Sequence, residues 1–114
     1  MLKVVNLSNG TEIADNIENA DSFFRRLKGL MFTKSLPAGH GLLIKPCQSI
    51  HTFFMNYPID VVYLDGNNEI VALDQSMKPS KVGKVYRKAS SVLELPDGTI
   101  RDTELKVGNH LSFN

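Results

Sequence analysis

The sequence predicts a mainly β fold, in which a small antiparallel sheet curls or closes into a barrel beside one short helix near residues 22–30. An α+β arrangement is the alternative. Three observations carry this prediction: short runs alternate apolar and polar residues, turn signals return roughly every 8–12 residues, and a helical period occurs in one stretch. Because neither a linker nor an internal repeat divides the 114 residues, we expect residues 1–114 to form a single domain.

The chain begins with a predicted hairpin. "LKVVNL" and "TEIADNI" both alternate apolar with polar residues, and the turn signal Ser8-Asn9-Gly10 separates them. These residues are therefore expected to form two short strands joined by a tight turn.

The segment "ADSFFRRLKGLMF" changes to a helical period and predicts the one helix. Asp21 or Ser22 is expected to cap its first turn. Its apolar residues have the spacing of a single stripe, which is expected to face the core: Phe23, Phe24, Leu27, Leu30 and Met31. Its basic residues are expected on the polar side or towards the negative end of the helix dipole: Arg25, Arg26 and Lys28.

The remaining strands follow from short apolar runs between turn signals. "LLI" at 42–44 predicts a short buried strand, and "IDVVYL" and "EIVAL" around "DGNN" predict a hairpin over residues 59–73. "SSVLEL" at 90–95 and the final "HLSF" predict two more strands. Between them, Thr99 with Asp102 resembles a capping box for a single helical turn.

Composition excludes several classes of protein. A hydrophobic content of 42% with 22% charged residues is typical of a soluble globular chain. No apolar run approaches the roughly 18 residues needed to cross a bilayer, so no membrane partner is expected. One cysteine excludes an intramolecular disulfide, and the expected location is the cytoplasm. A phosphate-binding glycine loop and a nucleophile elbow are both missing, which disfavours the common phosphate-transfer and hydrolase classes. No cofactor is expected.

The stretch "CQSIHTFFMNYPID", residues 47–60, holds the candidate catalytic residues. Cys47 and His51 are four residues apart, so on a helical turn the imidazole would lie beside the thiol and activate it. The alternative is that Cys47 is a small buried apolar residue and His51 a hydrogen-bonded neighbour of Phe53 and Met55. A metal site is not expected, because the potential ligands are too scattered: His40, His51, His110, Cys47 and Asp60.

The same stretch also predicts a binding groove. If residues 51–56 are extended, His51, Phe53 and Met55 share one face, and the opposite face is also largely apolar. Tyr57 precedes Pro58, which favours an extended corner and permits a cis bond. Asp60 needs a partner within an apolar strand, and the candidates are Arg25, Arg26 or backbone N–H groups. The predicted binding residues are Arg26, His51, Phe53, Met55, Tyr57 and Asp60.

The basic stretch at residues 78–88, "KPSKVGKVYRK", contains five Lys and Arg and no acidic residue. It could attract an anion or a nucleic acid. Pro79 and Gly83 break any helix that would align these charges, so a solvated loop is the preferred interpretation and a nucleic-acid partner is unlikely.

Three blocks resemble a known family: "RLKGLMFTKSLPAGHGLLI", "SIHTFFMNYPIDVVYLD" and "SSVLELPDGTIRDTELKVGNHLSF". Together they are similar to the family called domain of unknown function 192, from about Asp21 to the end of the chain. The resemblance implies a small, mostly β domain without an assigned reaction. Phe54-Met55-Asn56 stands where members often have Trp-Met-Lys-Asn, and Asn109 where they have Asp. The matching positions are Arg26, Gly29, Leu30, Met31, Gly41, Phe54, Met55, Pro58, Asp60, Leu93, Glu94, Gly98 and Gly108.

The functional hypothesis that follows is a module that binds a small molecule or a protein partner in a groove around residues 51–60. Two alternatives stay open. One is an enzyme that uses Cys47 with His51, and the other is anion or nucleic-acid binding through residues 78–88.

Overall fold

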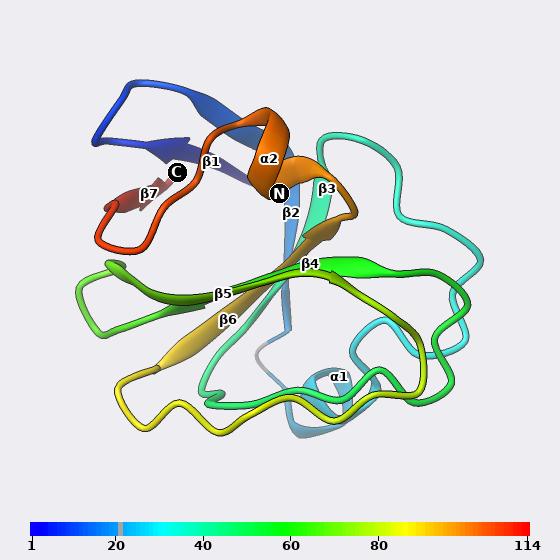
Figure 1. Cartoon of the computed structure of the whole chain (residues 1–114). Coiled ribbons are helices and arrows are strands. Elements are labelled where there is room, and N and C mark those ends of the chain that lie inside the picture. Colours follow the sequence, from blue (N-terminus) through cyan, green and yellow to red (C-terminus); the bar gives the residue numbers. More distant parts are fainter. Residues whose placement is uncertain (21) are drawn as a thin grey trace.

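The computed structural model describes residues 1–20 and 22–114, without the side chain of Phe23, so Asp21 lies outside the described residues. Its strands form one curled sheet in the order β5-β4-β6-β3-β2-β1-β7, accompanied by two short helices (Figure 1). The mainly β prediction is thus confirmed. The strands are β1 (Leu2–Asn6), β2 (Glu12–Ala20), β3 (His40–Ile44), β4 (Ile59–Leu64), β5 (Ile70–Met77), β6 (Ser91–Pro96) and β7 (Leu111–Phe113).

Each predicted strand is present, and the pairing differs from the prediction at one place. β1 with β2 and β4 with β5 are the two expected antiparallel hairpins. β2 and β3, however, run parallel, with Ile17 opposite Gly41. A parallel pair needs a crossover connection, and the helix with the long loop after it supplies that connection between residues 20 and 40.

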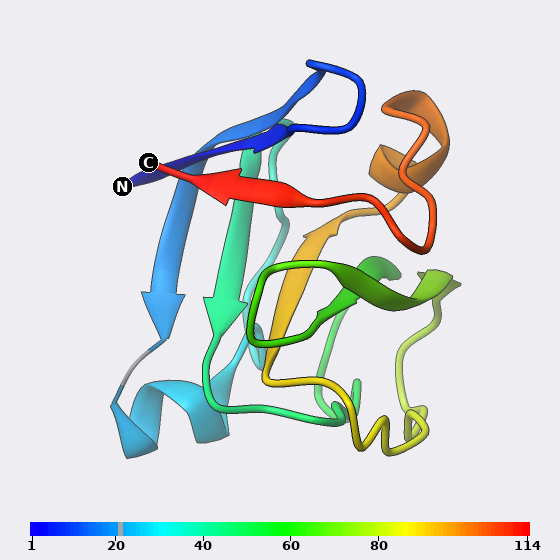
Figure 2. The ribbon, with the colours of Figure 1, turned by 90° about the vertical axis from the view of Figure 1, so that its left-hand side faces the viewer.

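The sheet curls until its two edges approach at one end (Figure 2). Ile70 N–H donates to Asn109 O at 2.8 Å and Leu111 N–H to Asn68 O at 2.9 Å, so the segment before β7 is hydrogen-bonded to the beginning of β5. These bonds satisfy part of each exposed strand edge. The curled sheet is therefore a half-barrel whose two faces support separate cores.

The two cores contain different parts of the central strands. All six residues of β4 are buried, and they alternate between the cores. The inner core is capped by the helix α2 (Thr99–Asp102) and includes Val62, Leu64, Leu93, Leu95 and Ile100. The outer core lies under the helix α1 (Phe23–Lys28) and the neighbouring loops, and it includes Leu30, Ile44, Met55, Val61 and Val92.

The helix near residues 22–30 is present, but the predicted apolar stripe is wrong. Ser22 caps α1, and its Oγ accepts a hydrogen bond from Arg25 N at 3.1 Å. Phe24 and Leu27 are exposed, whereas Arg25 and Arg26 are half-buried. The helix ends at Gly29, too early to continue the stripe. The Arg25 guanidinium binds Glu18 on β2 and donates a hydrogen bond to the Gly29 carbonyl.

Residues 51–56 are not extended, so His51, Phe53 and Met55 do not share one face. Phe54 has a φ of 62°, a left-handed conformation that reverses the alternation. Thr52 and Met55 are consequently buried, while His51, Phe53 and Phe54 face outward. The cis bond is at Lys45–Pro46 and not at Tyr57–Pro58.

Three segments of the chain meet at the end of the half-barrel that carries α1. They are residues 22–33, 45–56 and 78–90, here called the loop end, and Figures 1 and 2 both show them at the bottom of the molecule. The predicted loop over 78–88 forms part of it. Among the described residues, no helix is long and apolar enough to cross a membrane.

Candidate functional site

A cavity of about 210 Å³ opens at the loop end, between α1 with its following turn and the segment 44–55. Its walls are mainly apolar, and its polar groups are cations, a thiol, a hydroxyl and an imidazole. The residues that line it are Arg26, Leu27, Lys28, Gly29, Leu30, Met31, Ile44, Cys47, Ser49, Ile50, His51 and Met55.

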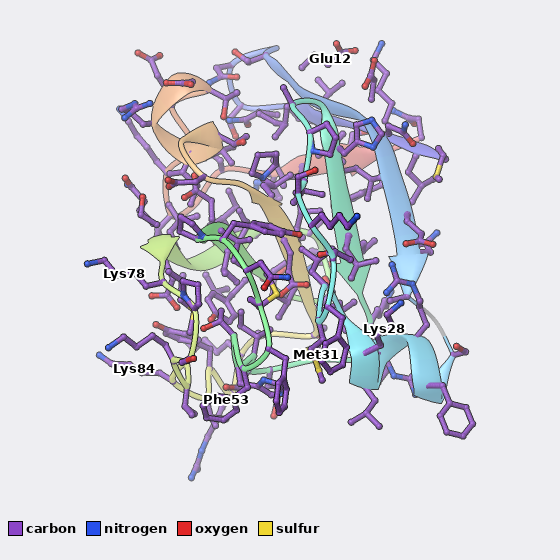
Figure 3. The ribbon with its side chains drawn as sticks, turned by 90° about the vertical axis from the view of Figure 1, so that its right-hand side faces the viewer. Glu12, Lys28, Met31, Phe53, Lys78 and Lys84 are labelled. Atoms are coloured by element: carbon purple, nitrogen blue, oxygen red, sulfur yellow. The ribbon has the colours of Figure 1, made fainter. Side chains whose placement is uncertain are left out.

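The end of α1 determines the shape of one wall. Gly29 has a φ of 52°, in a region that glycine enters more easily than other residues, and its N–H donates to Arg25 O at 3.0 Å. The chain then turns sharply, and Met31 N–H donates to Lys28 O at 2.9 Å. This turn directs Leu30 into the outer core and leaves Met31 half-buried at the cavity (Figure 3).

Thr52 holds the opposite wall in place. Its backbone N–H donates to Lys81 O at 2.8 Å, and its hydroxyl donates to Lys78 O and accepts from Lys81 N–H. His51 and Val82 form a β-bridge beside it. Because Thr52 is fully buried, these bonds are shielded from water, and the basic loop is attached firmly to the wall of the cavity.

Cys47 and His51 both line the cavity, but they are not arranged as a nucleophile and its base. The Cys47 thiol donates to Ser49 O at 3.0 Å, and His51 Nδ1 accepts from Phe53 N–H at 3.2 Å. Burial raises the pKa of the Cys47 thiol, and the carboxyl of Glu94 adds to this effect. A nucleophilic cysteine needs the opposite shift, so the geometry does not favour a thiolate.

Glu94 is a buried carboxyl just behind the cavity wall. It lies on β6 opposite Leu42 and Val61, and strand alternation directs its side chain to the outer core together with Val92. Its Oε1 has no hydrogen-bond partner among the described residues, and a Cβ added at Gly29 would be 3.7 Å from this oxygen. Burial raises the pKa of Glu94 to about 7, although the Arg25 guanidinium lowers it.

The structure brings some of the predicted binding residues together and separates others. Arg26, His51 and Met55 share the cavity with Cys47. The remaining predicted residues do not line it: Phe53, Tyr57 and Asp60. The cavity thus takes in part of the predicted groove around residues 51–60 and is otherwise lined by residues 26–31, 44, 47, 49 and 50.

The three predicted residues outside the cavity have other contacts. Phe53 is exposed, with its ring 5.2 Å from the His51 ring. The Tyr57 hydroxyl is 2.6 Å from the Thr33 hydroxyl. Of the expected partners, the backbone N–H groups are the ones found: the two Asp60 oxygens accept from Ser76 N–H at 2.9 Å and Ile100 N–H at 2.8 Å, which ties β5 and α2 to β4. Asp60 therefore holds the fold together.

Two of the potential metal ligands, His40 and His110, do not line the cavity. His40 contacts Asn16, and His110 forms an ion pair with Glu69 at 3.3 Å. Among the residues that the structure describes, no group of three or more His, Cys, Asp or Glu could hold a metal ion.

The predicted site residues do not include Glu94, although the sequence carries a signal for it. "VLEL" places one carboxylate in a strand that is otherwise apolar, the same pattern that drew attention to Asp60. A buried carboxylate needs a partner or a proton. The pattern could identify Glu94 as buried, but not its position behind a glycine 65 residues earlier in the chain.

Comparison with known proteins gives a consistent result. The model of the DUF192 family, described as "Uncharacterized ACR", matches residues 4–113. A UPF0127 protein from Pyrococcus furiosus is 34% identical over 97% of both chains, and one from Thermococcus kodakarensis is 31% identical over 96% of this chain and 72% of that protein.

Solved structures share the fold at low identity. A protein from Sinorhizobium meliloti, named a candidate transcription regulator, superimposes with a TM-score of 0.83 at 21% identity, over 98% of this chain and 91% of its own. A protein of unknown function from Novosphingobium aromaticivorans gives a TM-score of 0.82 at 18% identity, over 97% and 82%. At these identities the likeness extends to the fold alone.

Proposed function

This chain belongs to the DUF192 family, a family described as uncharacterized, and we propose that it is a binding module for a small ligand with an apolar body and an anionic head group. The site is the cavity between α1 and residues 44–55. The observation that carries the proposal is its lining, which among the described residues combines apolar walls with two cations and contains no carboxylate.

The size of the cavity supports a ligand of about one ring. A dry protein cavity of roughly 150 Å³ accepts benzene, and sites for drug-sized molecules begin near 300 Å³. A volume of about 210 Å³ lies between these values. A single-ring acid, or one side chain of a larger partner, therefore fits the space.

The polar groups support an anionic head. Arg26 and Lys28 lie at the cavity, and a guanidinium binds a carboxylate through paired hydrogen bonds. Five of the positions that carry the family resemblance also line this cavity: Arg26, Gly29, Leu30, Met31 and Met55.

Glu94 gives the proposal a pH dependence. Its carboxyl lies behind Gly29 and would repel an anionic head group when it is ionised. Because its pKa is raised to about 7, mainly by burial, the repulsion is present above neutral pH and is removed below it. Binding of an anion should thus strengthen as the pH falls through 7.

The experiment uses three matched single-ring probes that differ in charge: benzoate, benzyl alcohol and benzylamine. In backbone amide NMR spectra, benzoate is expected to bind most tightly and to shift the amides of Gly29, Leu30 and Cys47. Lowering the pH from about 8 to about 6 should tighten benzoate binding several-fold, as the Glu94 proton is taken up.

The matched variants are Glu94→Gln, which should abolish this pH dependence, and Glu104→Gln at an exposed glutamate, which should leave it unchanged. If no probe shifts these amides, or if all three bind elsewhere, the proposal is wrong.

A further inference from the structure

The charges of this protein are unevenly distributed along the chain. The three segments of the loop end contain nine of the 13 Lys and Arg residues and none of the 12 Asp and Glu residues, so their formal charge is +9. The other segments, with four cations and 12 acidic residues, have −8. The net charge of +1 therefore conceals a concentration of cations in the loop end, where Glu18 on β2 reaches Arg25.

Lysines of the basic stretch at residues 78–88 remain available to a partner. Arg25 is paired with Glu18, but none of the ion pairs formed by the described residues includes Lys78, Lys81 or Lys84. Lys78 and Lys84 project outward from one side of the loop end in Figure 3, and Lys28 lies on the other side. A concentration of unpaired cations of this kind attracts an anionic surface.

Large apolar side chains protrude among these cations. In Figure 3, Phe53 and Met31 lie between Lys84 and Lys28. Five further apolar side chains of the loop end are 61–70% exposed: Leu27, Phe32, Phe54, Val82 and Val85. They come from all three segments, so exposed apolar side chains occur on every part of the loop end.

Two of the exposed aromatic residues are also held in an unfavourable backbone conformation. Phe32 has a φ of 65° and Phe54 a φ of 62°, values at which bulky residues are rare. Phe32 N–H donates to Phe54 O at 3.0 Å, and the rings stack with centroids 5.3 Å apart. Asn or Gly would adopt this backbone more easily, so folding alone does not account for two exposed phenyl rings here.

We propose that the loop end docks on a lipid surface that contains anionic phospholipids, with the exposed Phe, Leu and Val side chains entering the hydrocarbon and the cations contacting the head groups. Charge complementarity identifies the lipid as anionic. The mixture of aromatic and aliphatic side chains identifies hydrocarbon as the second contact.

The same features disfavour a nucleic acid. Single-stranded nucleic acids are bound on open aromatic faces, but the Phe32 and Phe54 rings stack on one another. The aliphatic side chains of Leu27, Val82 and Val85 offer no face for a base. The absence of a membrane partner was expected because no segment spans a bilayer, and a surface that lies on a bilayer needs no spanning segment.

The proposal is tested by sedimentation of the full chain with vesicles. Vesicles of phosphatidylcholine with about one-third phosphatidylserine are expected to bind at least tenfold more protein than phosphatidylcholine alone, and about 0.5 M NaCl should release most of it. Charge reversal with Lys81→Glu and Lys84→Glu should reduce binding to the anionic vesicles to a similar extent.

The apolar contact has its own variants. Phe54→Asn with Val85→Ser is expected to lower vesicle binding about tenfold, because hydrocarbon contact is lost. Neither residue lines the cavity, so benzoate binding should persist in this variant and the two proposals fail separately. The matched control is Leu7→Ser with Val107→Ser, two similarly exposed residues outside the loop end.

Three results would overturn the proposal. One is equal binding, or no binding, to the two kinds of vesicle. Another is full vesicle binding by the Phe54→Asn and Val85→Ser variant, because the exposed apolar side chains would then not contribute to binding. The third is tighter binding to a mixed-sequence single-stranded oligonucleotide than to anionic vesicles in the same buffer, which would assign the surface to nucleic acid.

Discussion

Replacing Glu94 by Gln should change how the stability of this protein depends on pH. Glu94 is almost completely buried on β6, and its Oε1 has no hydrogen-bond partner among the described residues. Burial raises the pKa of its carboxyl from 4.5 to about 7, and the nearby Arg25 guanidinium only partly opposes this. Gln has nearly the same shape and stays neutral at every pH.

The magnitude follows from the shift in the pKa. A rise of about 2.5 units corresponds to about 3 kcal/mol, at roughly 1.4 kcal/mol per unit. Between pH 4.5 and about 7 the folded protein keeps a proton that the unfolded chain has lost, so the free energy of unfolding falls as the pH rises through this window. Above about pH 7 the folded protein carries the full free-energy cost of a buried carboxylate.

The measurement is urea unfolding of the wild-type protein and Glu94→Gln at a series of pH values from about 4 to about 8. The free energy of unfolding of Glu94→Gln, relative to wild type, should increase by about 3 kcal/mol across the series. Glu104→Gln, at an exposed glutamate, should follow the wild type throughout. Parallel curves for Glu94→Gln and wild type would refute the reasoning, because the carboxyl would then be equally ionised in the folded and unfolded states.

Three further predictions test other parts of the molecule by the same unfolding assay and by thiol labelling. Asp60→Asn should lower the free energy of unfolding by about 1–3 kcal/mol, since one of two backbone N–H groups loses its acceptor. Asp102→Asn, at an exposed residue, should change it little, and equal losses in the two variants would contradict the anchoring role of Asp60. Gly41→Ala would put a Cβ 2.7 Å from the Glu94 carbonyl oxygen and should destabilise by about 1–3 kcal/mol, unlike Gly66→Ala, whose nearest neighbour would be 3.8 Å away. Because burial raises the pKa of Cys47, iodoacetamide near neutral pH should label it about tenfold more slowly in the folded protein than in urea, and faster labelling in the folded protein would revive the enzyme hypothesis.

The parts of the fold that the sequence predicted correctly are those specified by neighbouring residues. The hairpin of β4 and β5 follows from two apolar runs around "DGNN", and β1 and β2 follow from alternation around Ser8-Asn9-Gly10. The parallel pairing of β2 with β3 could not be predicted in this way, because it depends on a crossover whose course is determined by packing.

The same distinction explains the errors in α1 and in residues 51–56. The spacing of Phe24 and Leu27 indicated a buried stripe, but the choice of buried face depended on Glu18, which binds Arg25 from another strand. The alternation over residues 51–56 indicated an extended strand, but the hydrogen bonds of Thr52 to residues 78–81 determine its path.

Both errors occurred at the loop end, where the local pattern and the final structure disagree. Local preferences and global fold agree in most of a natural protein, and disagreements are concentrated at functional or strained sites. Here Phe32 and Phe54 combine exposure with left-handed backbone. Behind the adjacent cavity lies the carboxyl of Glu94, whose Oε1 has no hydrogen-bond partner among the described residues. A chain selected only for stability would replace all three residues. The free energy of unfolding of Phe54→Asn, measured in urea, should accordingly equal that of wild type or exceed it by up to about 1 kcal/mol. If Phe54→Asn instead loses more than about 1 kcal/mol, the ring is needed for folding and its exposure no longer points to a partner.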